Sequence, residues 1–211
     1  MWGLVESGSI TKIINNPRAM VIGDVRHSRN IFSFRWSNEE REAIGIYEVV
    51  FNNTNKKDEA YYTNTNQSFA FADGVVTASF GSATAKAHAD TTYTNQDNTD
   101  GLIPSGKSVG DVKVEGLKTI RIKNIKSQAA GILAETDWYI VRKADADTAI
   151  PSAITNHRAA VRTKCAAMET LVTNASNTAA IETLYTPVNT ADEGDPVVME
   201  RPLGELPRLE V

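Results

Sequence analysis

The chain has 211 residues, a formal net charge of −4, 41% hydrophobic residues and 23% charged residues. This balance is typical of one sizeable globular domain or of two small ones. The weakly acidic charge argues against a nucleic acid as the partner, and no apolar run approaches the ~18 residues that a membrane helix needs. We therefore expect neither nucleic acid nor membrane binding.

The first half of the chain has short apolar runs separated by turn residues, which is the pattern of β-strands. The Ser7–Gly8 break between two such runs predicts a hairpin over residues 4–14. Residues 46–51 are rich in β-branched and aromatic side chains and form the strongest predicted strand. Shorter strands are predicted over residues 31–34 and 59–63.

Two local signals fix further turns and caps in this half. The Asp73–Gly74 pair lies between two alternating runs and predicts a second hairpin, because both turn residues must take a positive φ. Ser37 followed by Glu40 is a capping box, which predicts a short helix that Gly45 ends. The aromatic residues of this region are predicted to fill a core, with an exposed carbohydrate-binding platform as the alternative: Tyr61, Tyr62, Phe69, Phe71 and Phe80.

Residues 89–111 are predicted to be a linker or an exposed loop, because they contain few aliphatic side chains. Gly101–Ser108 matches the phosphate-binding pattern G-x-x-x-x-G-K-S. Such a loop needs a buried strand before it and a helix that begins at the lysine, so that backbone amides hold the phosphates. The polar residues before it and Gly110 after it predict neither element. We interpret the match as coincidence and expect no cofactor.

The second half of the chain has apolar residues at helical spacing. A first helix is predicted over residues 118–134, and Thr136 or Asp137 can cap a short second one. Pro151 fits the first turn of a third helix, and residues 180–185 make a short last one. The third helix could form a homomeric coiled coil or pack against helix 118–134, and we favour the second because one charge interrupts its seam: Ile154, Arg158, Val161, Cys165, Met168 and Val172.

Strands followed by helices predict an α+β fold. We expect an N-terminal antiparallel β domain over residues 1–88, the linker or exposed loop over 89–111, a helical hairpin or small bundle over 112–186, and an extended C-terminal arm over 187–211. Trp138 follows the Thr136–Asp137 cap and is predicted to anchor the helical part by packing between helix 118–134 and the third helix. The arm is predicted to bind a partner protein through its apolar side chains: Leu203, Leu206, Leu209 and Val211.

Residues suited to chemistry are scattered along the chain. The three histidines lie far apart and none has a Cys, Asp or Glu at metal-ligand spacing. Cys165, the single cysteine, sits on the helical seam, which favours a small buried hydrophobic residue over a nucleophile and excludes an intrachain disulfide. We therefore expect no catalytic, cofactor-binding or metal site, and a protein that is not an enzyme.

Two segments resemble bacteriophage tail proteins. Residues 130–162 contain Ile-Leu-Ala-Glu-Thr-Asp-Trp and then Thr-Asn-His-Arg-Ala-Ala-Val-Arg. They resemble the C-terminal region of phage tail-fibre assembly proteins and related tail proteins, in which a Leu-Ala-x-Thr-Asp-Trp turn precedes a Tyr-Arg-x-x-Leu/Val-Arg helix. His157 stands where that family has Tyr. The opening residues 2–11 are similar to the start of such tail proteins.

The resemblance implies a structural component of a virion tail: a tail-fibre, baseplate or neck accessory protein. Such a protein is made in the cytoplasm of the bacterial host, and we expect it to stay in the cytosol until assembly, because the N-terminus lacks a secretory signal pattern. Its expected partners are other virion tail proteins and further copies of itself in a homo-oligomer. The alternatives are a tail-fibre assembly chaperone absent from the finished particle, or an enzyme acting on polysaccharide or cell wall.

Overall fold

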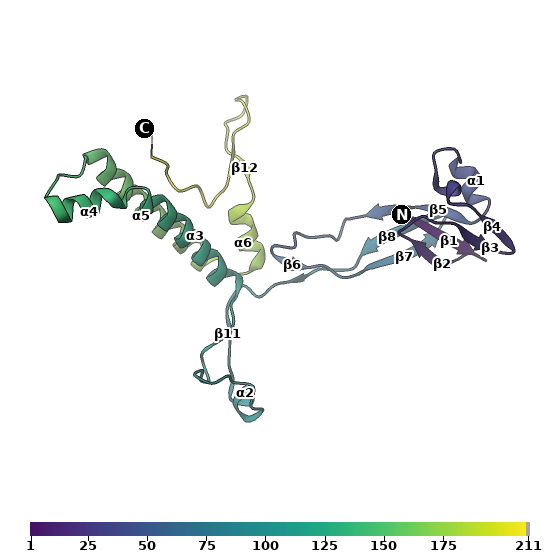
Figure 1. Cartoon of the computed structure of the whole chain (residues 1–211), viewed down its shortest axis with the longest axis horizontal. Coiled ribbons are helices and arrows are strands. Elements are labelled where there is room, and N and C mark those ends of the chain that lie inside the picture. Colours follow the sequence, from purple (N-terminus) through teal and green to yellow (C-terminus); the bar gives the residue numbers. More distant parts are fainter. Residues whose placement is uncertain (210–211) are drawn as a thin grey trace. The chain divides into compact units, whose positions relative to one another are not determined.

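The structure is a computed structural model that describes residues 1–209, and it has an α+β fold with strands first and helices second (Figure 1). This confirms the predicted fold class. The chain divides into two compact units, one over residues 1–84 and one from Ala85 onward. The division falls within the two-residue strand β9 (Thr84–Ala85), a few residues before the predicted end of the β domain.

The first unit is built on one five-stranded sheet. Both predicted hairpins are confirmed: Ser7 and Gly8 have φ of 51° and 76°, and Asp73 and Gly74 have φ of 52° and 78°. The strand order is β2-β1-β5-β8-β7. The strands are β1 (Trp2–Glu6), β2 (Ser9–Ile14), β5 (Ile46–Asn52), β7 (Gln67–Ala72) and β8 (Val75–Phe80).

The expected purely antiparallel sheet is wrong, because β8 lies parallel to β5. The chain leaves β5, crosses a long loop and forms β7, and β8 then turns back between β7 and β5. Burial explains why β8 takes the inner place: Val76 and Ala78 are fully buried, while alternate residues of β7 are exposed. The hairpin therefore inserts with its more apolar strand towards the centre of the sheet.

Each face of this sheet has its own apolar cluster. On one face, Val5, Val49, Val76 and Ala78 pack with partly buried aromatic rings that include Phe69 and Phe71, which supports the core interpretation for those two rings. Gly3 lies over Val76, and a Cβ there would come within 3.1 Å of both methyl groups. The buried residues of the other face are Leu4, Ile14, Ile31 and Ile46.

A layer of short elements covers the second face. It consists of β3 (Met20–Ile22), β4 (Val25–His27), the 3-10 helix η1 (Arg29–Phe32) and α1 (Asn38–Glu42). The capping box of Ser37 and Glu40 is confirmed at the start of α1. The predicted strand over residues 31–34 is wrong, because Ser28 caps a 3-10 turn there by accepting from the amide of Asn30. The predicted strand 59–63 shortens to β6 (Tyr62–Thr63).

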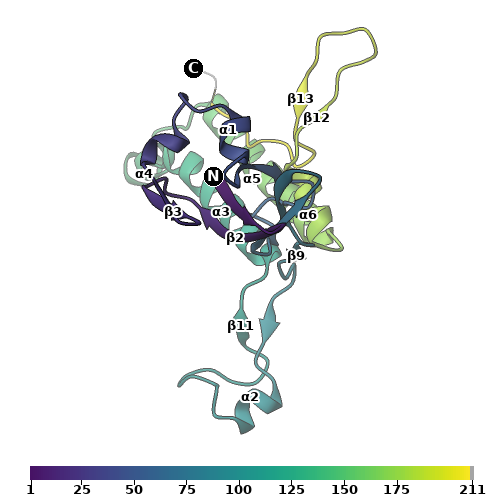
Figure 2. The ribbon, with the colours of Figure 1, turned by 90° about the vertical axis from the view of Figure 1, so that its right-hand side faces the viewer.

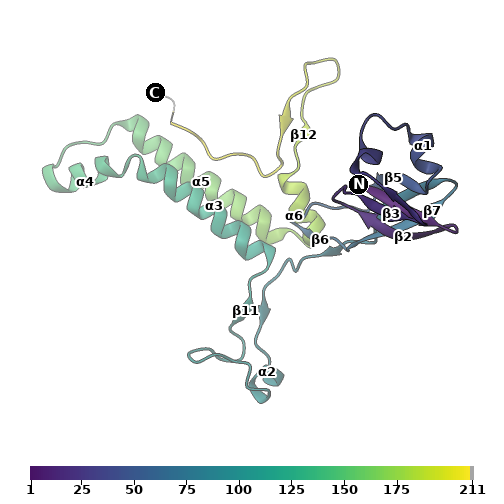
Figure 3. The same cartoon turned by 45° about the vertical axis from the view of Figure 1, so that its right-hand side comes forward.

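The second unit is built on two long antiparallel helices, which lie side by side in Figures 1 and 3. The four predicted helices are present as α3 (Leu117–Ala134), α4 (Asp137–Ala146), α5 (Ser152–Asn174) and α6 (Thr178–Tyr185). The α5 seam packs against Ile125 and Ala129 of α3, which confirms packing within one chain. Across residues 1–209, no helix combines the length and apolarity that crossing a membrane requires.

The segment expected to be a linker is an ordered hairpin of the second unit, formed by β10 (Thr91–Thr92), α2 (Asn95–Thr99) and β11 (Val112–Val114). Figure 2 shows it extending away from the helices. The Asp97 carboxylate holds it together, because it accepts from the backbone and the hydroxyl of Thr94 and forms an ion pair with Lys113. Polar side chains supply this local order.

The start of α3 is capped by a distant residue. Gly116 at the N-cap has no side chain, and Asp90 instead accepts from the Gly116 amide at 2.7 Å and from the Thr119 hydroxyl at 2.9 Å. A Cβ on Gly116 would lie 2.3 Å from the carbonyl carbon of Ala89, so only glycine fits. These hydrogen bonds lower the pKa of Asp90 and join the projecting hairpin to the helices.

After α6, a second hairpin forms from β12 (Val188–Asn189) and β13 (Met199–Glu200). It also projects from the helices (Figures 2 and 3). The predicted extended arm therefore begins with a hairpin. Residues 201–209 follow, with a turn at Pro202–Leu203 and no regular secondary structure after it.

The Asp97 anchor predicts a pH dependence of the first projecting hairpin. The ion pair with Lys113 and the Thr94 hydrogen bonds lower the pKa of Asp97 from 3.8 to about 2. Because the folded state favours the carboxylate, the stabilisation is complete above about pH 4 and is lost as the pH falls towards 2. An NMR titration of the Thr94 amide should show this low midpoint, and Asp97→Asn should abolish it. A midpoint near 3.8 would contradict the anchor.

Candidate functional site

The residues of the phage-like segment meet at the corner between α3 and α4. Arg158, on α5, donates from Nη1 to the carbonyl oxygen of Leu133 and to the Thr136 hydroxyl, both at 2.7 Å. Its Nη2 lies 2.8 Å from an oxygen of Asp137. The Arg158 side chain therefore joins the last turn of α3, the start of α4 and the second turn of α5.

This corner is largely shielded from water. Arg158 is 7% exposed and Thr136 is 3% exposed, whereas the Asp137 carboxylate remains at the surface. The Leu133 carbonyl, in the last turn of α3, already accepts from the amide and the hydroxyl of Thr136. Arg158 adds a charged donor to this carbonyl and donates to the oxygen of the Thr136 hydroxyl, and its positive charge also suits the negative end of the helix dipole. His157, the preceding residue of α5, is also buried.

The predicted role of Trp138 as a buried anchor is wrong, because its side chain is 51% exposed. Arg158 and Thr136 occupy the junction where the ring was expected. The ring instead stacks on Tyr139 at 3.8 Å between centroids, with the guanidinium of Arg142 4.7 Å from its centre. No residue of α4 is buried, and Ile140 and Val141 are exposed beside Trp138. This helix therefore presents an apolar and aromatic face to its surroundings.

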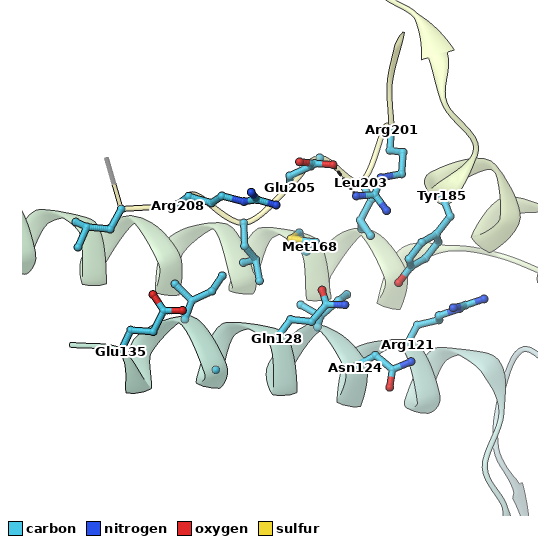
Figure 4. A pocket seen from close by; sticks show the side chains of 16 residues that line it. Arg121, Asn124, Gln128, Glu135, Met168, Tyr185, Arg201, Leu203, Glu205 and Arg208 are labelled. Carbon is cyan, nitrogen blue, oxygen red and sulfur yellow. Dashed lines mark hydrogen bonds and ion pairs between the residues drawn. The ribbon is translucent and has the colours of Figure 1, made fainter. Parts of the chain in front are cut away.

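A groove of about 790 Å³ runs along the two-helix pair, between α3 and the C-terminal segment (Figure 4). Its floor includes Ile125, Ile132 and Met168, and its α3 side carries a stripe of polar side chains. The stripe follows helical spacing along α3 and places both signs of charge on the groove wall: Arg121, Asn124, Gln128 and Glu135.

The C-terminal segment forms the other wall of this groove and is here called the strap. Leu203 is 2% exposed and belongs to the core of α3 and α5, and its amide donates to the carbonyl of Leu184. Its assignment as a partner-binding residue is therefore wrong, because its own chain already covers it. Leu206 and Leu209 are half-buried and line the groove. Val211, the fourth predicted interface residue, lies outside the described residues.

The segments singled out for chemistry are not brought together into a reactive site. Gly101–Ser108 lies between α2 and β11, without the strand before and the helix after that a phosphate-binding loop requires. The Cys165 thiol is buried on the seam, and burial together with the nearby Glu169 carboxylate raises its pKa, which favours the unreactive thiol. Among the described residues, no three His, Cys, Asp or Glu side chains could share a metal ion.

The sequence interpretation missed the exposed apolar side chains of the two projecting hairpins. Val112 and Val114 are 40% and 58% exposed on the first hairpin, and Val197 is 71% exposed on the second. The available signal was the Val-Val-Met run at residues 197–199, an apolar group within an otherwise acidic stretch. Its pairing strand has only two residues, too few for a sequence pattern to predict the hairpin.

Comparison with protein-family models, with curated proteins and with solved structures finds no match to this chain.

The buried guanidinium makes a strong prediction for stability. Arg158→Met should cost about 1–3 kcal/mol of unfolding free energy, because it removes the charged donor from the Leu133 carbonyl and leaves the oxygen of the buried Thr136 hydroxyl without a donor. Arg162→Met, one turn along the same helix and exposed, is the matched control and should change stability by less than about 0.5 kcal/mol. Denaturant melts that give equal values for both variants would contradict the role of Arg158.

The strap makes a second prediction. Leu203→Ala should lower the unfolding free energy of the chain by about 2–4 kcal/mol, because it opens a cavity over the two-helix core. Val197→Ala, at an exposed position of the neighbouring hairpin, should have little effect. Thermal or urea unfolding measures both, and a Leu203→Ala variant as stable as Val197→Ala would show that the strap does not rest on the helices.

Proposed function

We propose that this protein is a structural component of a bacteriophage tail, such as a tail-fibre, baseplate or neck accessory protein, and that it acts by binding other tail proteins. The observation that carries the proposal is the resemblance of residues 130–162 to phage tail proteins. Within that segment, Arg158 donates to the Thr136 hydroxyl at 2.7 Å and pairs with the Asp137 carboxylate at 2.8 Å. The resembling residues therefore act together physically, as parts of one module.

The exposed apolar side chains support a binding role. Projecting hairpins and the free face of α4 place valine, methionine and tryptophan side chains at the surface, on segments with ordered backbone. Exposed apolar groups on ordered projections are typical of surfaces that a partner covers. The exposed positions are Val112, Val114, Trp138, Val141, Val188, Val197, Val198 and Met199.

A tail-fibre assembly chaperone is the second candidate, because the Thr-Asp-Trp turn resembles that class equally. Trp138 on the exposed face of α4 would suit a transient complex with a fibre subunit. The two candidates differ in one observable property: a structural component stays in the finished particle, whereas a chaperone leaves before assembly ends.

Quantitative mass spectrometry of particles tests the proposal. In gradient-purified virions of the phage that encodes this chain, peptides of the protein should appear in a fixed ratio to the other tail subunits. The host lysate from the same infection is the control for expression. Presence in the lysate with absence from the particles would overturn the structural role and favour the chaperone.

A further inference from the structure

The layer that covers the sheet of the first unit carries a group of exposed cations, here called the basic layer: Arg18, Arg26, Arg29 and Arg35. Between Lys12 and Arg35 the chain has five lysines and arginines and one carboxylate, Asp24, although its overall charge is −4. Among residues 1–209, none of the four arginines forms an ion pair. The basic layer is therefore a positive surface over residues 12–35 of an acidic protein, although α1, in the same layer, carries the exposed carboxylates Glu39, Glu40 and Glu42.

Apolar side chains stand exposed on the same layer. Val21 and Val25 of the β3–β4 hairpin are 59% and 57% exposed, and Val21 pairs directly across from Arg26. Phe34 is 95% exposed, beside Arg35 in the loop between η1 and α1. Exposed aromatic rings and arginines together are typical of the centre of a protein–protein interface, because these residue types contribute most of the binding free energy there.

The β12–β13 hairpin has the opposite charge. Residues 187–200, here called the acidic hairpin, contain four carboxylates and no Lys, Arg or His: Asp192, Glu193, Asp195 and Glu200. None of these carboxylates forms an ion pair within the part of the chain that the structure describes. Val188, Val198 and Met199 are 42–56% exposed on its strands. A lone two-stranded hairpin is marginally stable in water, so this one gains from being covered.

We propose that the acidic hairpin of one copy docks on the basic layer of a second copy. The two surfaces have opposite charge, each leaves its charges unpaired, and each has exposed apolar side chains that the other would cover. Since the copies carry the same net charge of −4, association needs such a local pairing to overcome their general repulsion.

The pairing joins two different surfaces, so it is head-to-tail. A head-to-tail complex has an unoccupied acidic hairpin at one end and an unoccupied basic layer at the other. Further copies can therefore bind at both ends, which gives a closed ring or a filament. This inference deepens the proposed function by naming a partner for the structural subunit, and it rests on that function only for its setting in a virion.

A charge-reversal experiment on the full chain tests this pairing. The hairpin variant is Asp192→Lys with Asp195→Lys, and the layer variant is Arg26→Glu with Arg35→Glu. Sedimentation velocity should show wild-type assemblies that grow with concentration at about 50 mM salt and dissociate at about 0.5 M. Each variant alone should associate at least about tenfold more weakly. Mixing the two variants should restore assembly, because the unchanged hairpin of the layer variant then meets the unchanged layer of the hairpin variant. In the other pairing, the introduced lysines face the introduced glutamates.

Two control variants match the change in net charge at exposed sites elsewhere. Asp100→Lys with Asp145→Lys matches the hairpin variant, and Lys57→Glu with Lys107→Glu matches the layer variant. Both should assemble as the wild type does, and circular dichroism should show the native helix content in all four proteins. Loss of assembly in the controls as well would reduce the effect to net charge and overturn the pairing.

Other outcomes separate the competing explanations. A chain that stays monomeric at all concentrations overturns the proposal. The proposal is also overturned if the wild type does not self-assemble but binds single-stranded DNA, and the layer variant does not bind it. A monomeric chain that is nevertheless present in virions would overturn this pairing alone. Charge-dependent assembly of a chain absent from virions would overturn the tail-component function alone.

Discussion

The guanidinium of Arg158 is the interaction on which the helical unit depends. It donates to the Leu133 carbonyl at the end of α3, and it holds Thr136 and the start of α4 against the second turn of α5. That fixes how far the two long helices overlap. Lys118 near the start of α3 then reaches the carbonyl of Thr173 at the end of α5, and the apolar residues of both helices meet between these two points.

Arg158 is placed where a purely apolar seam would be expected. A buried charge is a weak source of stability, because taking it out of water costs about as much as its partners return. A buried charge can nevertheless select one arrangement of the helices. If α3 slipped along α5, the guanidinium of Arg158 would be buried without its carbonyl and hydroxyl partners, so that arrangement is unfavourable. We interpret Arg158 as the residue that sets the register of the helices. The strap residue Leu203 then completes the core over them.

The sequence predicted the features that depend on neighbouring residues. Hairpin turns at Ser7–Gly8 and Asp73–Gly74, the Ser37 capping box and the α5 seam all follow from local conformation or periodicity. The features it missed depend on residues far apart in the chain. The place of β8 between β5 and β7 and the capping of α3 by Asp90 arise only when distant segments meet.

The candidate site divides in the same way. Arg158 was recognised as the charge in the seam, but the sequence does not say that it binds the turn at Thr136, and Trp138 was therefore placed in the space that Arg158 fills. Leu203 was recognised as apolar in a proline-rich segment, yet its burial on its own helices needed the three-dimensional groove. The Val-Val-Met run is visible in the sequence, but the exposure of the hairpin valines follows only from the pairing of the two-residue strands.

A double-mutant cycle between Arg158 and Thr136 tests the central claim most directly. Arg158→Met, Thr136→Val and the double variant would be unfolded in denaturant, and their free energies compared with the wild type. If the guanidinium holds the corner through the hydroxyl, the coupling energy should be about 1–2 kcal/mol, because the two single losses then overlap. Additive losses, with a coupling energy below about 0.3 kcal/mol, would contradict the account.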